Sequence, residues 1–167
     1  MSDTSLTILL MWHVGSVVFW LGSSATFVIA VHPSLRSLDS DERRSFLRSF
    51  LPTFSKFLGA ASISTVVAGF LLFAYVSSVR TPIGPTGWRF VFVLIGGTLG
   101  LIAAILTLGV ALPLASRFMD PRSQISNGPR YTVLDEAAIV SGLNSVMRSV
   151  VIVLLLAFGM MLLGAYT

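Results

Sequence analysis

The chain has 167 residues, of which 54% are apolar and 11% charged, against roughly 25% charged in a typical soluble domain. With a mean hydropathy of +0.88, this composition excludes a disordered chain and a conventional water-soluble enzyme. There is no cysteine, which excludes disulfides, thiolate metal sites and cysteine nucleophiles. The net charge is +4, but the basic residues lie between apolar runs, so we interpret them as topology signals and expect no nucleic-acid partner.

Four stretches are long enough to cross the bilayer as helices, which takes about 20 apolar residues. We expect spans at about 6–31, 54–78, 88–115 and 146–166. None alternates with period two, as a transmembrane barrel would. The first run lacks a basic n-region and exceeds the 7–15 apolar residues of a signal peptide, so it is kept as a span. The sequence thus predicts an all-α, polytopic membrane protein, a single four-helix domain over 1–167 with no convincing internal repeat.

Lys and Arg are concentrated in the segments between spans one and two and between spans three and four. The short link between spans two and three has only Arg80 and Arg89, and neither terminus has a basic residue. Because short cytoplasmic loops carry the excess of Lys and Arg, we expect a multi-pass protein of the inner or plasma membrane with both termini external.

Two connecting segments carry helix signals. Asp39 or Ser40 is a suitable N-cap, and the phenylalanines and leucines of 46–51 interleave with arginines at helical spacing. This pattern predicts an amphipathic helix on the inner interface that leads into span two, with a kink at Pro52. A tight turn is expected at 81–87 and a loop at 120–130, with a helix resuming at Leu134.

The chain has two histidines, His13 and His32. His13 lies about seven residues into span one, roughly 10 Å below the outer boundary at about 1.5 Å per residue. Ionisable groups inside a membrane are costly and usually face a partner, a cavity or a cofactor. The alternative is a neutral histidine hydrogen-bonded between helices. His32 lies at the cytoplasmic end of the same helix, too far away to share a metal or haem with His13, and its role is left open.

Trp20 follows His13 by seven residues and therefore lies on the same helix face. It is a candidate cofactor-binding residue, with plain packing as the alternative. Gly15 and Gly22 are also seven apart, on nearly the opposite face, where they would let a neighbouring helix approach closely. Gly96 and Gly100 form a GxxxG pattern in span three, which is a helix-packing signal.

Met160 and Met161 lie in span four at roughly the depth of His13. An imidazole and a thioether are suitable axial ligands for haem iron, or for Cu(I) with a further ligand. The alternative is that these methionines fill gaps in the bundle. Arg89 is placed to meet an anionic group such as a haem propionate or a lipid phosphate, although interfacial arginines commonly only snorkel.

No Ser/His/Asp set is evident, and no span contains a carboxylate, which disfavours a proton-relay pump. The pattern His-x6-Trp-x-Gly, formed by His13, Trp20 and Gly22, resembles one found in the CopD copper-resistance domain, in related four-helix membrane domains and in HemJ-type protoporphyrinogen oxidases. The resemblance continues through residues 33–36, 43–50 and 67–72. It implies a four-helix bundle in which His13 is the haem or metal ligand. HemJ-type proteins also carry a lysine in span three, a few residues after a tryptophan; here Trp88 is followed by Arg89 and no lysine.

The leading hypothesis is therefore a membrane protein that binds haem b through His13, with Met160 or Met161 as a second ligand. It would act in electron transfer or redox chemistry with a membrane partner or quinone. The second hypothesis is copper binding or transport through the same residues. The third is a structural subunit, in a homo-oligomer or a larger membrane complex, whose glycine faces pack against partner proteins.

Overall fold

The computed structural model describes residues 3–79, 87–119 and 133–166, and the regular secondary structure in these ranges is entirely helical. In chain order the helices are α1 (Asp3–Thr26), η1 (Phe27–Val31), α2 (His32–Ser34), α3 (Ser40–Val79), α4 (Trp88–Leu106), η2 (Thr107–Ala111), α5 (Leu112–Met119) and α7 (Val133–Tyr166). The predicted turn at 81–87, apart from Gly87, and the predicted loop at 120–130 lie outside the described residues.

Four helical runs are long and apolar enough to cross a membrane: Thr4–Ser34, Ser40–Ser77, Phe90–Arg117 and Ala137–Gly164. The all-α class and the four spans expected from the sequence are confirmed. In α7, helix begins at Val133, one residue before the predicted start. The helical form follows from the solvent, because a bilayer offers no partner for an unpaired backbone group and a helix satisfies its own.

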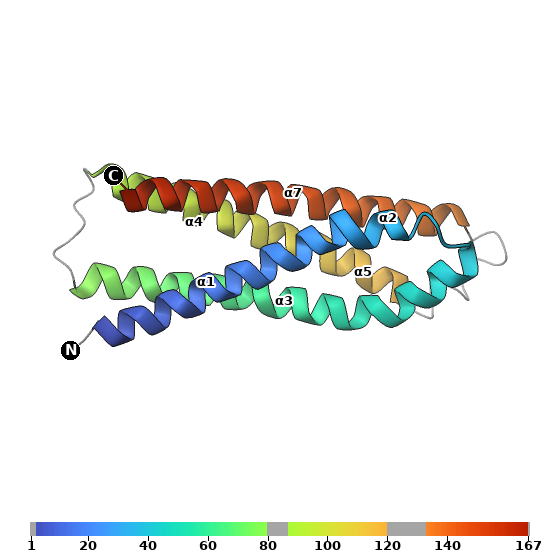
Figure 1. Ribbon diagram of the computed structural model, residues 1–167, viewed down its shortest axis with the longest axis horizontal. Helices are drawn as coiled ribbons and strands as arrows, with labels where there is room; N and C mark the ends of the chain where they lie inside the picture. The colour runs from blue at the N-terminus through green and yellow to red at the C-terminus, as the bar shows by residue number, and fades with distance from the viewer. Residues whose placement is uncertain (1–2, 80–86, 120–132, 167) are drawn as a thin grey trace.

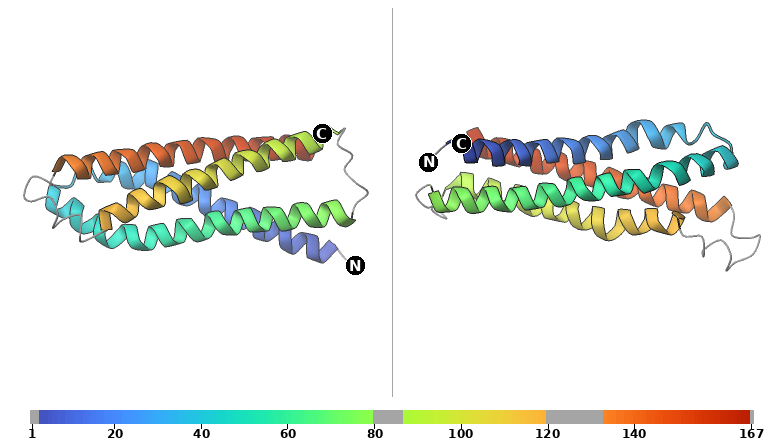
Figure 2. Two further views of the ribbon diagram at one scale, coloured as in Figure 1. Left: turned by 180° about the vertical axis from the view of Figure 1, so that it is seen from behind. Right: turned by 90° about the horizontal axis from the view of Figure 1, so that it is seen from below.

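The helices form two hairpins, α1 with α3 and α4 with α7, which make the most extensive interhelical contacts (Figures 1 and 2). Helix α1 begins beside α3 and runs obliquely, so that η1 contacts α7 (Figure 1). The start of α1 and the end of α7 lie at the same end of the bundle (Figure 1). We call this the terminal end.

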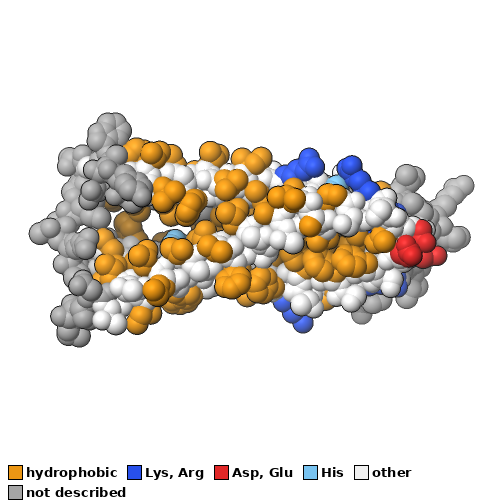
Figure 3. Space-filling view, viewed as in Figure 1, with side chains coloured by type: hydrophobic (Ala, Val, Ile, Leu, Met, Phe, Trp, Pro, Cys, Tyr) orange, Lys and Arg blue, Asp and Glu red, His pale blue; other side chains and the backbone are white. Residues whose placement is uncertain are grey.

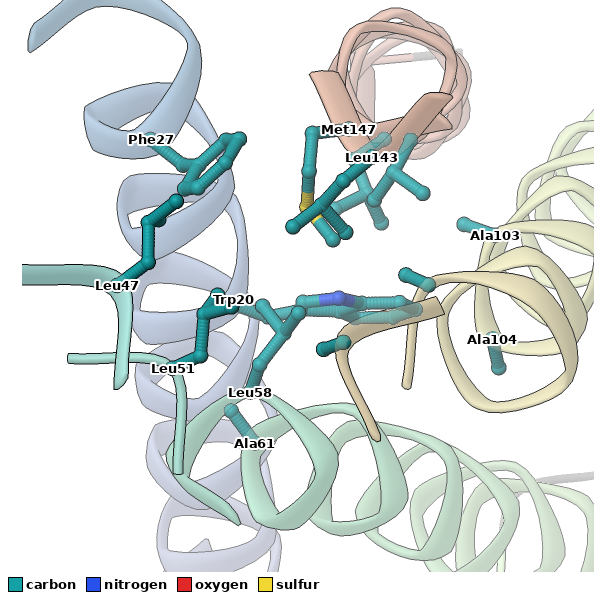
Figure 4. Close-up of a cluster of buried hydrophobic side chains, with 14 of the residues drawn as sticks. Trp20, Phe27, Leu47, Leu51, Leu58, Ala61, Ala103, Ala104, Leu143 and Met147 are labelled. Carbon is teal, nitrogen blue, oxygen red and sulfur yellow. The ribbon is translucent and has the colours of Figure 1, made fainter. Parts of the chain in front are cut away.

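The hydrophobic core lies in the half of the bundle away from the terminal end. Its centre is Trp20 of α1, whose side chain has 0% exposure. Residues of η1, α3, α4 and α7 surround it (Figure 4). Phe27 stacks on Phe54 at a centroid distance of 5.5 Å and extends this core. Many large apolar side chains face outward along all four spans, as expected where lipid is the solvent.

The predicted amphipathic segment is the first part of α3, continuous with the span that follows. Asp39 Oδ1 accepts hydrogen bonds from the backbone N–H groups of Asp41 and Glu42, both at 2.9 Å, so Asp39 is the predicted N-cap. Leu47 and Leu51 of this segment are buried in the core. The helix bends in its first third (Figure 1), as expected near an internal proline such as Pro52.

Two π-helical segments, η1 and η2, occur at equivalent places in the two hairpins, 80 residues apart. His32 N–H bonds to the carbonyl of Phe27, and Leu112 N–H to the carbonyl of Thr107. Pro33 and Pro113 each follow two residues after the π turn. A proline has no N–H and clashes with the carbonyl four residues earlier, and the wider π turn just before it accommodates this defect.

The two halves of the described structure follow a similar order of helices, although the sequence has no convincing internal repeat. Both halves run as a long helix, a π turn, a short proline-containing helix and a second long helix. The shift of 80 residues also relates buried positions, such as Ser24 with Ala104 and Leu35 with Ala115. The paired residues differ in side chain, so the sequence does not show this similarity in helix order.

The glycines behave differently from the prediction for span one. A Cβ added at Gly15 or Gly22 would meet nothing within 4 Å, so no described helix packs closely there and that expectation is wrong within this chain. In the GxxxG pattern only Gly96 packs closely against another helix, α7. A Cβ at Gly96 would lie 2.8 Å from Met161 Cγ and 3.2 Å from the Ala157 carbonyl, whereas Gly100 is open.

Candidate functional site

His13 lies in α1 facing α3, and its ring is held by the backbone of that helix. The Nδ1 atom is 3.1 Å from the carbonyl oxygen of Thr65. A carbonyl can only accept, so Nδ1 carries the hydrogen and donates it, and in the neutral ring Nε2 keeps a free lone pair. Among the described residues, Nε2 has no hydrogen-bond partner. Metal-bound histidines commonly have this arrangement, in which one nitrogen donates to a carbonyl and the other binds the metal.

Gly69 provides the space in which the His13 ring sits. It lies one helical turn after Thr65, on the same face of α3. A Cβ at Gly69 would be 3.0 Å from His13 Cε1 and 3.3 Å from Nδ1. Any side chain at this position would therefore press on the ring and disturb its bond to Thr65.

A closed ring of three hydrogen bonds joins α1 and α3 beside His13. The Trp12 indole N–H donates to Ser64 Oγ at 2.8 Å, the two serine oxygens Ser64 Oγ and Ser16 Oγ are 2.9 Å apart, and the Ser16 hydroxyl donates to the Trp12 carbonyl at 2.8 Å. Since the Ser16 hydrogen goes to that carbonyl, the Ser64 hydroxyl is the donor between the serines. The network satisfies every polar group in it and sets the rotation of α1 against α3.

The two hairpins separate toward the terminal end, and the surface is hollowed between them. Figure 3 shows this hollow with a histidine side chain at its edge. His13 itself is only half-buried, so part of its side chain is accessible from outside the packed core.

Trp20 does not share this site. Its side chain is fully buried in the core, and its Nε1–H has no hydrogen-bond partner among the described residues. Seven residues separate it from His13, about 10 Å along the helix. The structure thus gives Trp20 a packing environment, and a role in cofactor binding stays a prediction.

Of the two predicted thioether ligands, Met161 of α7 packs against Gly96 of α4. Met160 is half-buried on α7. The role of both methionines as ligands stays a prediction. Arg89 belongs to the first turn of α4, but its side chain lies outside what the structure describes.

Within residues 3–79, 87–119 and 133–166, no three His, Cys, Asp or Glu side chains come close enough to hold a metal ion together. An ion bound directly at His13 would therefore need other ligand types. Haem differs in this respect, because its macrocycle supplies four nitrogens and the protein need add only one or two axial ligands.

Sequence reasoning identified His13 but missed the residues that hold it. Thr65 and Gly69 are four apart, as are Trp12 and Ser16, so each pair lies on one face of its helix. A stripe of small and hydroxyl residues in span two was the available signal, since such residues are enriched where membrane helices pack closely.

The fold and the four apolar spans define the class: an all-helical, membrane-type four-helix bundle, compatible with a multi-pass membrane protein, that carries His13 within its first span. Comparison with known proteins adds no relative, since no family model, no curated protein and no solved structure matches this chain.

Proposed function

We propose that this chain binds haem b through His13 Nε2 and acts in electron transfer or redox chemistry within the membrane. The observation that carries the proposal is the bond from His13 Nδ1 to the Thr65 carbonyl. It selects the tautomer whose Nε2 lone pair is available, and it holds the ring against α3 in a fixed orientation. Such a bond also raises the basicity of the ligating nitrogen.

The donor set favours haem over a copper ion. The described residues offer no cluster of three His, Cys, Asp or Glu, so copper bound directly at His13 would depend on thioether ligands such as Met160 or Met161. A single half-buried imidazole is enough for haem, because the macrocycle brings its own four nitrogen ligands. Once bound, such a group supplies one-electron redox chemistry.

The chain's own residues would bind and tune this group. His13 would hold the haem iron, and Gly69 leaves room for its ring. The protein ligands and the polarity of their surroundings would set the reduction potential. Met160 or Met161 is the candidate second ligand, for which Met161 would have to leave Gly96, and Arg89 is the candidate partner of a propionate. The electron partner would be a quinone or another membrane protein.

The proposed orientation follows the distribution of basic residues. Arg43, Arg44 and Arg48 lie at the start of α3, far from the terminal end. If the end of the bundle that carries these arginines faces the cytoplasm, as the positive-inside rule predicts, both termini are external and His13 lies in the outer leaflet of the inner or plasma membrane.

The test is an absorption spectrum of the protein purified in detergent, recorded oxidised and dithionite-reduced, together with metal analysis. The proposal predicts a Soret band, a sharpened reduced α band and about one iron per chain. Copper without a Soret band would favour the copper hypothesis. A colourless, metal-free protein that does not bind added haemin would instead favour the hypothesis of a structural subunit.

A further inference from the structure

A second polar cluster lies near the end of the bundle opposite the terminal end and is independent of the proposed function. His32, the first residue of α2, is 8% exposed. The positive charges of Arg36 and Arg148 both act on its ring. Arg36 follows α2 in the chain, whereas Arg148 belongs to α7, so the cluster joins the two hairpins. Figure 3 shows two basic side chains flanking a histidine on this part of the surface.

No described group neutralises this cluster. Neither ring nitrogen of His32 has a hydrogen-bond partner among the described residues, and neither is sealed from the surface. Neither arginine forms an ion pair with a residue that the structure describes.

The nearest acidic residue along the chain, Asp39, is engaged elsewhere, because its Oδ1 caps α3 through the N–H groups of Asp41 and Glu42. The acidic side chains visible in Figure 3 gather at the tip of the bundle, away from the two basic ones beside the histidine. Two cations and an imidazole thus share one site in which no described side chain supplies an anion.

The depth of the cluster matches the level of lipid headgroups. Arg148 precedes Tyr166, the last residue of α7, by 18 positions, about 27 Å along the helix at about 1.5 Å per residue. A bilayer core is about 30 Å thick. If the terminal end of the bundle lies at one face of the membrane, Arg148 therefore lies close to the other face. Cations at this level meet phosphate groups.

We propose that His32, Arg36 and Arg148 form a binding site for a phosphate group. The guanidinium forks suit phosphate oxygens, since two parallel N–H bonds match their spacing, and a His32 nitrogen supplies a further donor. The site bridges the hairpins through α2 and α7, so a bound phosphate would tie the two halves together. A lipid headgroup and a free phosphate share this chemistry.

The test uses the full-length chain, delipidated in a neutral detergent and titrated with phosphatidylglycerol, with diacylglycerol as the phosphate-free lipid, or with inorganic phosphate alone. Binding is followed by native mass spectrometry and by calorimetry. The double variant Arg36→Gln/Arg148→Gln removes the two charges, and His32→Gln removes the ring. The matched control Arg48→Gln/Lys56→Gln removes two exposed charges from α3. Circular dichroism and gel filtration confirm that each variant is folded.

Each lost charged bond should weaken binding about tenfold or more, so the double variant should lose at least about 100-fold while the control changes less than about threefold. This result with phosphatidylglycerol but not with diacylglycerol assigns a lipid headgroup. The same dependence with inorganic phosphate assigns a soluble phosphate. Absence of binding to the wild-type protein in both arms, or equal losses in the double variant and the control, would overturn the proposal.

Discussion

Gly69 lies directly against the His13 ring: a Cβ at Gly69 would be 3.0 Å from His13 Cε1 and 3.3 Å from Nδ1. Contacts under 3.4 Å need a neighbour to move, and the ring cannot retreat without stretching its bond to Thr65. Gly69→Ala should therefore lower haem retention by roughly tenfold, the equivalent of one lost hydrogen bond. Haem content per chain, measured by pyridine haemochrome, tests this.

The matched control is Gly15→Ala, in the same helix as His13, where an added Cβ would meet nothing. It should leave haem content unchanged. Equal losses at both positions would mean that the Gly69 effect reflects general destabilisation and not the His13 ring.

The contact of Gly96 with α7 makes this glycine a stability determinant. A Cβ there would be 2.8 Å from Met161 Cγ and 3.2 Å from the Ala157 carbonyl. The methionine can bend away but the carbonyl cannot, so Gly96→Ala should destabilise the fold by about 1–3 kcal/mol. Unfolding in mixed micelles measures this, with the open position Gly100→Ala as control. If Gly100→Ala is as costly as Gly96→Ala, the α4–α7 contact is not the cause.

The π turn at η1 predicts an unusual tolerance to deletion. A π turn holds one residue more than an α turn, and Ile29 is 74% exposed. Deleting Ile29 would leave Phe27 and His32 at α-helical spacing on one face. Deleting Val18, which is also exposed at 61%, would rotate one part of α1 by about 100° against the other. We expect a folded, monodisperse protein for the first deletion only; the reverse order of stability would count against this account of η1.

Substitutions at Trp20 test whether this side chain serves packing or cofactor binding. Its Nε1–H is buried without a partner among the described residues, so Trp20→Phe removes an unsatisfied donor at a small loss of volume and should change stability by less than about 1.5 kcal/mol. Trp20→Ala should cost about 3–5 kcal/mol. Neither should shift the absorption maximum of a group bound at His13. A shift in Trp20→Phe would show that the indole N–H contacts the cofactor.

The spans were predictable from the sequence because long runs without charge have few other structures available in lipid. Helix rotation was not. The face of a membrane helix toward lipid is as apolar as the face toward the core, so Gly15 and Gly22 were indistinguishable in the sequence from a packing glycine such as Gly96.

The candidate site was half predictable for a related reason. A histidine in a span is conspicuous because its burial is costly, whereas its partner in α3 is a backbone carbonyl, that of Thr65. Backbone carbonyls are the same for every residue type, so no sequence pattern marks the carbonyl that accepts this hydrogen bond. The distance of 52 residues between the partners depends on how α1 and α3 pack.

The central claim is that His13 Nε2 holds the cofactor, and the most direct measurement is the absorption spectrum of His13→Ala purified beside the wild-type protein. Removal of the axial imidazole should abolish the Soret band of the purified protein. Imidazole added to the haemin-reconstituted variant should restore a band by filling the vacated space. A Soret band of wild-type intensity in His13→Ala, without added imidazole, would contradict the account.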